Sequence, residues 1–165
     1  MNEMERFQGL PPVEPYEMIG LWTGRGIPSG HPIDGVLENL GWFGKRFLAQ
    51  MRADALLFRY GEKCLVAIDP AWIPLRLAFR FPKLGRTRAA SNLASYLLRR
   101  IRAKGPVASL KAIPFHGVTS AAMAYDTQPI VDYFRKVDDD RVMGAMVIEG
   151  DDRVYFFELN RVREM

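Results

Sequence analysis

The last third of the chain is an almost continuous series of segments with the composition of β-strands. After Gly105 and Pro106, β-branched, aromatic and small apolar residues alternate with polar ones, and the links between segments are short and contain Gly or Asp. One of these links holds the run Asp138–Asp140, which is typical of a solvated hairpin tip. Residues 107–162 are therefore predicted to form an antiparallel meander of the segments SLKAIPFH, VTSAAMAYD, VDYFRKVD, RVMGAMVIE and RVYFFELNRV.

The first half of the chain adds further strand-like segments and one short helix. Pro32 suits the first position of a helix, and apolar residues at helical spacing follow it as far as Leu40. The preceding segment has three glycines, which weaken a strand but let another backbone or a ligand approach closely. The strand-like segments are GLWTGRGI, WFGKRFL, ALLFRY and CLVAID.

The remaining stretches are less regular. Residues 1–12 are predicted to be a loose leader, since Pro11 and Pro12 interrupt any helix. Residues 70–87 are ambiguous because prolines divide an apolar run, whereas an amphipathic helix is expected near residues 88–104. About eight to ten short strands in mostly antiparallel order favour a closed up-and-down β-barrel, with residues 1–165 forming a single domain.

Composition is that of a soluble protein. Of the 165 residues, 48% are apolar and 25% are charged, and no apolar run is long enough to span a bilayer. The first residues lack a secretory signal, and the single Cys64 cannot form an internal disulfide, so we expect a cytoplasmic location. Because Cys64 alternates with Val66 and Ile68 on an apolar strand, it is expected to pack in the core.

Charge is distributed unevenly along the chain. Residues 70–125 contain no carboxylate but ten Lys and Arg residues, so this segment favours an anionic partner. The partner could be a ligand carboxylate or phosphate, or an anionic membrane surface contacted through the basic region 76–104. Nucleic acid is less favoured, because no helix-turn-helix, zinc or RNA-recognition pattern accompanies the arginines.

Several short motifs of the chain are found together in a known family. They are Gly20-Leu21-Trp22-Thr23-Gly24, Gly30-His31-Pro32-Ile33-Asp34-Gly35, Gly41-Trp42-Phe43-Gly44-Lys45-Arg46-Phe47, Ser120-Ala121-Ala122-Met123-Ala124-Tyr125-Asp126, Pro129-Ile130, Asp132, Phe134-Arg135-Lys136-Val137-Asp138 and Gly144. With these motifs, the chain resembles the GXWXG protein family over residues 15–50 and, over residues 107–160, the domain of unknown function that usually follows it. The resemblance implies a lipocalin-like, calycin-type barrel. Val147 and Glu149 depart from the expected acidic-then-basic pattern of the penultimate strand.

In lipocalin-like barrels, a tryptophan of the first strand plugs the closed end and an arginine of the last strand stacks over it. The resemblance assigns these roles to Trp22 and Arg161, in a cation–π contact that contributes about 1 kcal/mol. The helix after the first strand is then expected to cap or flank one mouth of the barrel.

The first group of candidate site residues is His31, Asp34 and Lys45. They are expected to line the mouth of the barrel, where His31 could act as an acid or base near neutral pH. The alternative is structural: His31 stabilises the turn, and Asp34 accepts hydrogen bonds from amides at the start of the helix.

The second group lies on the meander. On VDYFRKVD, strand alternation separates Asp132 and Phe134 from Arg135, yet neither face is purely apolar. Since a buried charge must be paired, Asp126, Asp132 and Arg135 form either an internal salt-bridge set or a polar anchor for a ligand. In the second case, Asp126 or Asp132 is a candidate catalytic acid or base.

Aromatic residues complete the expected pocket, with Trp42, Tyr125 and Phe134 as ligand contacts. His116 at a strand end is expected to be structural, with ligand contact and haem ligation as alternatives. The sequence has no metal-ligand spacing, phosphate-binding loop or dinucleotide fingerprint. We therefore expect no metal and no cofactor, with haem as the alternative.

Three functions are therefore compatible with the sequence. The first is intracellular binding of a small, largely apolar molecule with an acidic or carbonyl group, anchored by Arg135, Lys45 and His31. The second is a cofactor-independent isomerase, cyclase or lyase that uses acid–base chemistry on such a molecule. The third is a haem-binding barrel.

Overall fold

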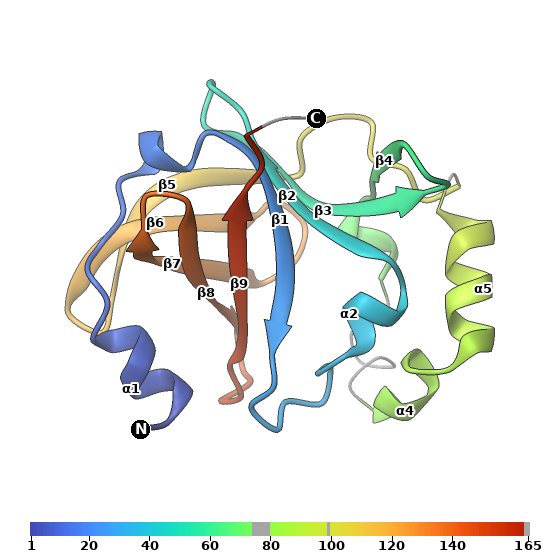
Figure 1. The fold of residues 1–165 in the computed structure, drawn as a ribbon, viewed down its shortest axis with the longest axis horizontal. Coiled ribbons are helices and arrows are strands. Elements are labelled where there is room, and N and C mark those ends of the chain that lie inside the picture. Colours follow the sequence, from blue (N-terminus) through green and yellow to red (C-terminus); the bar gives the residue numbers. More distant parts are fainter. Residues whose placement is uncertain (74–79, 99, 164–165) are drawn as a thin grey trace.

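The computed structural model describes residues 1–73, 80–98 and 100–163, which fold around a single antiparallel sheet (Figure 1). The nine strands pair in the order β2-β1-β9-β8-β7-β6-β5-β3-β4, and β2 also pairs with β3. Eight of them thus form a ring, with β4 attached outside it to β3. The strands are β1 Gly20–Ile27, β2 Trp42–Phe47, β3 Arg52–Tyr60, β4 Cys64–Ala67, β5 Ala108–Phe115, β6 Val118–Tyr125, β7 Ile130–Asp138, β8 Arg141–Ile148 and β9 Tyr155–Arg161.

The predicted antiparallel arrangement is confirmed. Around the ring, each strand lies beside its neighbour in the chain once β4 is set aside, as expected for a meander. Short turns connect β5 to β6 and β7 to β8, and the Asp139–Asp140 pair forms the second of these turns. The number of strands also lies within the predicted range.

Glycines on β1 and β2 allow the walls of the ring to pack closely. A Cβ atom on Gly24 would overlap the indole ring of Trp42, and one on Gly44 would overlap the backbone of Trp22. The second glycine of the G-x-W-x-G motif therefore leaves room for another tryptophan, and Gly44 lets β2 approach β1. Both are cases in which the absence of a side chain permits close packing.

The helix after β1 is shorter than predicted. Residues 32–35 form a turn, and α2 spans only Val36–Asn39. Gly35, with a φ of 78°, precedes it in the left-handed region that glycine adopts without strain. The predicted helical spacing was correct locally, but this turn delays the start of the helix.

The basic segment is also less helical than predicted. Within the described residues, the 3₁₀ turn η2 (Pro70–Trp72) is followed by the helices α4 (Pro82–Gly85) and α5 (Arg88–Leu97). The α5 helix ends early because the chain returns to the sheet: Ala103 N–H donates to Ala67 O at 2.9 Å, beside an isolated bridge between Ile68 and Arg102. Pairing with β4 replaces the last predicted turns of helix.

The N-terminus differs from the loose leader predicted for residues 1–12. Residues Glu3–Gln8 form helix α1, whose start is fixed by a capping box between Asn2 and Glu5. Phe7 of α1 is completely buried against the outside of the sheet. The prolines end the helix without preventing it, because they follow its last residue.

The segment after α1 fills a gap in the sheet. Lys136 N–H donates to Pro11 O at 2.9 Å, and Ala121 N–H donates to Val13 O at 2.8 Å. Ser120 Oγ is buried there and donates to Phe134 O at 2.6 Å. The 3₁₀ turn η1 (Pro15–Met18) then leads into β1.

Two apolar clusters stabilise the fold. The larger fills the ring and contains Trp22, Trp42 and Phe134, whereas the smaller lies outside it between α1 and strands β8 and β9. Cys64 belongs to neither, because it pairs with Tyr60 beside the β3–β4 turn and is exposed. The prediction of core packing for Cys64 was therefore wrong, although Val66 on the same strand is buried. No helix in the described parts of the chain could span a membrane.

Candidate functional site

A cavity of about 440 Å³ lies between one side of the ring and a cover made by α2, η2 and α5. Its lining comes from residues far apart in the sequence, including Leu56 on β3, Leu97 on α5 and Met146 on β8. Among the described lining residues, polar side-chain groups come from Gln128, the hydroxyl group of Tyr125 and the indole N–H of Trp72, and the other side chains are apolar. The cavity is thus apolar with a small polar region, which is the usual composition of a small-molecule site.

Behind Tyr125 lies a buried ionic cluster. Lys45 Nζ is 2.9 Å from Asp132 Oδ2, and the two side chains are only 3% and 1% exposed. The Tyr125 hydroxyl donates to the same Asp132 oxygen at 3.3 Å, and Lys45 Nζ donates to the Tyr125 oxygen at 3.4 Å. A further bond from Lys45 Nζ to Ala55 O measures 2.9 Å. The ammonium group therefore directs its hydrogen bonds at three acceptors.

This cluster bridges opposite walls of the ring. Lys45 is on β2 and Asp132 is on β7, and three strands separate β2 from β7 in either direction around the ring. The same two strands also meet through Phe47 and Phe134, whose rings pack edge to face at 5.6 Å. Alternation brings these side chains inward, since residues two apart on a strand share a face.

Aromatic rings surround the ammonium group of Lys45. The nitrogen lies 5.8 Å from the ring centre of Trp42, 5.8 Å from that of Tyr125 and 5.2 Å from that of Phe157. Cation–π attraction at such distances partly replaces the lost hydration of a buried cation. Trp42 thus has two contacts in the ring: it stabilises the Lys45 cation, and it packs on Gly24.

Burial changes the proton affinities in this cluster. It raises the pKa of Asp132 above its ordinary value, against the opposing effect of Lys45. It also raises the pKa of Tyr125 well above 10.0, and the neighbouring Asp132 charge adds to this effect. Tyr125 therefore remains a hydrogen-bond donor at any physiological pH. Asp132 Oδ1 is buried and, within the described residues, has no hydrogen-bond partner.

His31 and Asp34 lie on the turn that leads to α2. Asp34 Oδ2 accepts hydrogen bonds from the backbone N–H groups of Ser29, Gly30 and His31 at 3.0, 2.9 and 3.0 Å. His31 is buried, and its Nδ1 accepts from the Ile33 N–H at 3.2 Å. The His31 contact matches its structural alternative, whereas Asp34 accepts from amides of the turn before the helix and not from those at the start of α2. Their position remains next to the cavity, because Ile33 lines it.

The surroundings of His31 favour its neutral form. Its ring packs edge-on against Tyr155 at 5.6 Å. Burial lowers the pKa of His31 below 6.5, while the nearby Asp34 charge partly opposes this. Burial also raises the pKa of Tyr155, whose hydroxyl has no hydrogen-bond partner within the described residues.

The structure separates Asp126, Asp132 and Arg135, which the sequence placed in one set. Asp126 forms a two-oxygen ion pair with Arg52 at a solvent-accessible position. Arg135 is buried outside the ring, where its guanidinium lies 5.1 Å from the centre of the Phe7 ring of α1. It donates to backbone carbonyls, including Leu10 O at 3.0 Å. Of the three, only Asp132 faces the interior cluster.

His116 occupies the turn between β5 and β6 and is exposed. Its ring contacts Phe115 at 4.4 Å, and it does not belong to the lining of the apolar cavity. In the described part of the chain, no three His, Cys, Asp or Glu side chains are grouped so that they could hold a metal ion.

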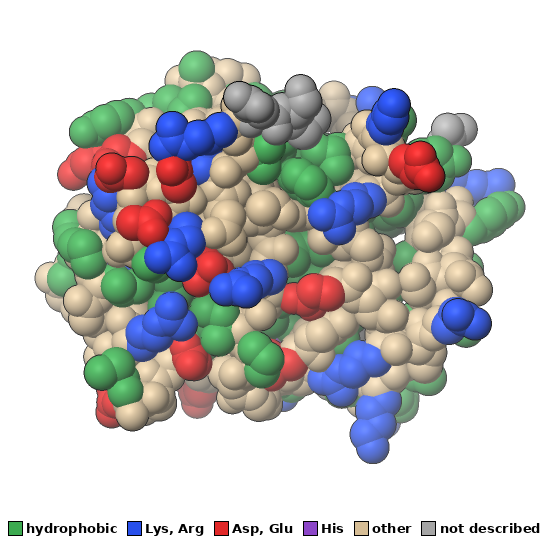
Figure 2. Space-filling view, in the orientation of Figure 1, with side chains coloured by type: hydrophobic (Ala, Val, Ile, Leu, Met, Phe, Trp, Pro, Cys, Tyr) green, Lys and Arg blue, Asp and Glu red, His purple; other side chains and the backbone are tan. Residues whose placement is uncertain are grey.

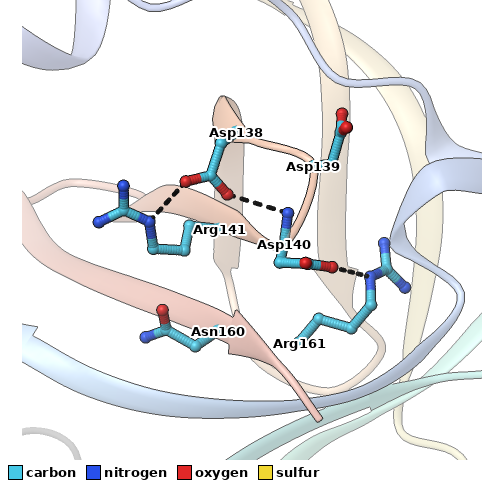
Figure 3. Close-up of a pocket in the computed structure, with 6 residues that line it drawn as sticks. All are labelled: Asp138, Asp139, Asp140, Arg141, Asn160 and Arg161. Carbon is cyan, nitrogen blue, oxygen red and sulfur yellow. Dashed lines mark hydrogen bonds and ion pairs between the residues drawn. The ribbon is translucent and has the colours of Figure 1, made fainter. Parts of the chain in front are cut away.

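The acidic hairpin tip between β7 and β8 borders a shallow surface pocket (Figure 3). Its carboxylates point toward basic partners: Asp138 accepts from Arg141 Nε at 2.7 Å, and Asp140 lies 3.5 Å from Arg161. Asp139 pairs with Lys136 at 3.1 Å. The pocket therefore consists of neutralised surface charges, as the predicted solvated hairpin tip implied.

Sequence reasoning missed parts of the site. Tyr155 and Phe157 were not singled out, although they alternate on β9 and could have been assigned to its inner face. Gln128 and the residues of α5 carried no such signal, because their approach to the cavity depends on how the segment after β4 folds back.

Comparisons with known proteins agree with the resemblance in the sequence. The GXWXG protein family matches residues 5–63, and the domain of unknown function DUF4334 matches residues 106–161. A solved structure described as a protein from Thermomonospora curvata is 29% identical, with a TM-score of 0.70 over 97% of this chain and 85% of that one. The search of curated proteins found no match. The chain therefore belongs to the proteins in which a GXWXG region is followed by a DUF4334 domain.

Proposed function

We propose that the protein binds a small, largely apolar molecule with a carbonyl or acidic group in the cavity between the ring and α5. The observation that carries this proposal is an apolar lining in which, among the described residues, polar side-chain groups come only from Trp72, Tyr125 and Gln128. A volume of about 440 Å³ is within the range of small-molecule sites. In this interpretation, the ring functions as a lipocalin-like barrel whose contents are partly covered by a helix.

The polar end of the ligand is assigned to Tyr125. A carbonyl or carboxyl group loses its hydration on entering an apolar cavity and needs a hydrogen-bond donor there. The raised pKa of Tyr125 keeps its hydroxyl protonated. To donate to the ligand, the hydroxyl would turn away from Asp132 Oδ2, and Lys45, 3.4 Å from the hydroxyl oxygen, would balance the Asp132 charge behind it.

Cavity binding is tested with the apolar dye Nile red and with two variants in which an alanine of α5 is replaced by phenylalanine. Ala94 lines the cavity, whereas Ala89 is exposed on the same helix. Ala94→Phe should fill the cavity and weaken Nile red binding at least tenfold, and Ala89→Phe should bind as the wild type does. Equal dye binding by both variants would place the dye elsewhere and overturn the proposal.

The polar end is tested by competition. A medium-chain fatty acid and the alkane of the same chain length should both displace Nile red, the acid more strongly. Tyr125→Phe removes one hydroxyl group and should reduce the advantage of the acid, by about 1–2 kcal/mol for a lost hydrogen bond. An unchanged advantage in this variant would show that Tyr125 does not bind the polar group.

Acid–base catalysis is the second candidate, and the state of Asp132 favours it. Its pKa is raised by burial, and one of its oxygens lacks a partner within the described residues, as a general base requires. Asp132 would remove a proton next to the carbonyl of the ligand, while Tyr125 and Lys45 stabilise the oxygen on which charge develops. No cofactor is needed for such a step.

This second function is tested by deuterium exchange at the carbon next to the carbonyl of a ketone that displaces Nile red. NMR in heavy water should show exchange faster than in buffer, and Asp132→Asn should abolish the acceleration while retaining dye binding. Binding of the ketone without accelerated exchange would leave ligand binding as the only function.

A further inference from the structure

Large apolar side chains are exposed mainly on one segment of the molecule. Within the described residues, Trp72, Phe81, Leu84, Leu93 and Tyr96 are 67%, 47%, 63%, 58% and 68% exposed. The other exposed large apolar residues are Met1 and Tyr16, near the N-terminus. Scattered apolar residues are normal on a protein surface, but a concentration on η2, α4 and α5 indicates contact with an apolar partner.

The same segment is strongly basic. Residues 70–125 contain no Asp or Glu. Exposed basic residues lie among the apolar ones, including Lys83 on α4, Arg88 on α5 and Arg100 after the end of α5. Figure 2 shows Lys and Arg side chains at the right of the molecule, over α4 and α5, whereas most of the Asp and Glu side chains visible in this view are on the left.

This basic and apolar face also borders the cavity. Trp72 of η2 and Leu93 of α5 both line the cavity, yet more than half of each side chain is exposed. They therefore stand at its rim. A surface bound to η2 and α5 would lie directly over the entrance.

We propose that η2, α4 and α5 form a docking face for the surface of an anionic lipid bilayer. Exposed Trp, Tyr, Phe and Leu side chains insert into the boundary between headgroups and acyl chains. The basic side chains among them pair with lipid phosphates, each contributing about 1 kcal/mol near an anionic surface. This charge pattern matches an anionic bilayer better than nucleic acid, for which the exposed leucines would have no use. Docking does not depend on whether the cavity holds a ligand.

Tryptophan fluorescence provides a local readout. Trp22 and Trp42 are buried in the ring, and Trp72 is exposed on the docking face. Vesicles of phosphatidylglycerol and phosphatidylcholine should shift the emission to shorter wavelength, and brominated acyl chains should quench it. The Trp72→Phe variant should show neither the emission shift nor the quenching, and it should still co-sediment with the vesicles. Quenching that persists in Trp72→Phe would overturn the proposed orientation.

Charge reversals test the electrostatic part. Lys83→Glu with Arg88→Glu changes two exposed residues of the face, and a Glu at position 88 suits the first turn of α5. This pair should weaken binding to the mixed vesicles by about 30-fold or more, because each basic residue contributes about fivefold. The control is Lys63→Glu with Lys111→Glu, which changes the net charge by the same amount at exposed positions in the β3–β4 turn and on β5. This control pair should reduce binding much less.

The outcomes separate docking from general charge attraction and from other partners. Equal losses in both double variants, with circular dichroism unchanged, would overturn the proposal in favour of non-specific attraction. Failure of the wild type to bind the mixed vesicles would also overturn it, and concentration-dependent dimerisation or DNA binding would then identify the alternative partner. Binding to phosphatidylcholine alone with equal affinity would contradict the role of the basic residues.

Discussion

Lys45 and Asp132 form an ion pair across the interior of the ring, with 2.9 Å between Lys45 Nζ and Asp132 Oδ2. They come from strands that are opposite one another around the ring, so the pair joins two walls that are not hydrogen-bonded to each other. A buried ion pair is weak evidence for stability, because dehydration of two charges offsets much of their attraction. Its position behind Tyr125 makes it part of the proposed ligand site.

The first prediction concerns this pair. Lys45→Met leaves the Asp132 charge buried without its partner and should lower the free energy of unfolding by about 3–5 kcal/mol. The double variant Lys45→Met with Asp132→Leu should lose much less, because neither charge remains. Urea unfolding followed by tryptophan fluorescence measures both. A double variant as unstable as the sum of its single variants would show that the two charges do not interact.

The second prediction is a pH dependence from His31. Burial lowers its pKa below 6.5 in the folded protein. As the pH falls below 6.5, His31 takes up a proton in the unfolded chain but not in the folded chain. The free energy of unfolding therefore decreases as the pH falls through this range. The slope attributable to His31 is at most about 1.4 kcal/mol per pH unit.

Urea unfolding between neutral and mildly acidic pH checks this sign. His31→Gln should lose less stability than the wild type over the interval. His116→Gln is the control, because it replaces the other histidine, which lies in an exposed turn, and its stability should follow the pH profile of the wild type. Identical profiles for the wild type and His31→Gln would contradict the prediction.

The third prediction concerns the second glycine of the G-x-W-x-G motif. Gly24→Ala should destabilise the protein by about 1–3 kcal/mol, because the new methyl group overlaps the Trp42 ring and forces it to move. The control is Gly105→Ala, where a Cβ atom meets open space. Thermal unfolding compares the two. If Gly24→Ala were as stable as Gly105→Ala, close packing of Trp42 would not explain the motif.

The fourth prediction concerns Arg161, whose guanidinium carbon lies 4.3 Å from the centre of the Trp22 ring. Its Nη1 also donates to Ile19 O at 3.0 Å, which anchors the chain before β1. Arg161→Met should cost about 2–3 kcal/mol, from one cation–π contact and charged hydrogen bonds. A double-mutant cycle with Trp22→Leu should give a coupling of about 1 kcal/mol, and additive effects would contradict the cation–π contact.

Local patterns in the sequence were sufficient for much of the fold. Alternating apolar residues and short turns predicted the antiparallel meander, and the resemblance to the GXWXG family paired Trp22 with Arg161, which face each other in the register of β1 and β9. The length of α2 and α5 was not predictable in this way. Their ends depend on Gly35 and on the pairing of residues 101–103 with β4, which are contacts with neighbouring structure.

For the site, the sequence by itself identified the charged and aromatic residues, because a charge on a strand with apolar neighbours must be paired or functional. It could not choose their partners. Arg135 is nearer to Asp132 in the sequence than Lys45 is, yet alternation turns Arg135 outward to α1 and Asp132 inward. Only closure of the ring brings β2 opposite β7, so the tertiary structure decided that Lys45 meets Asp132 and that α5 covers an apolar cavity beside them.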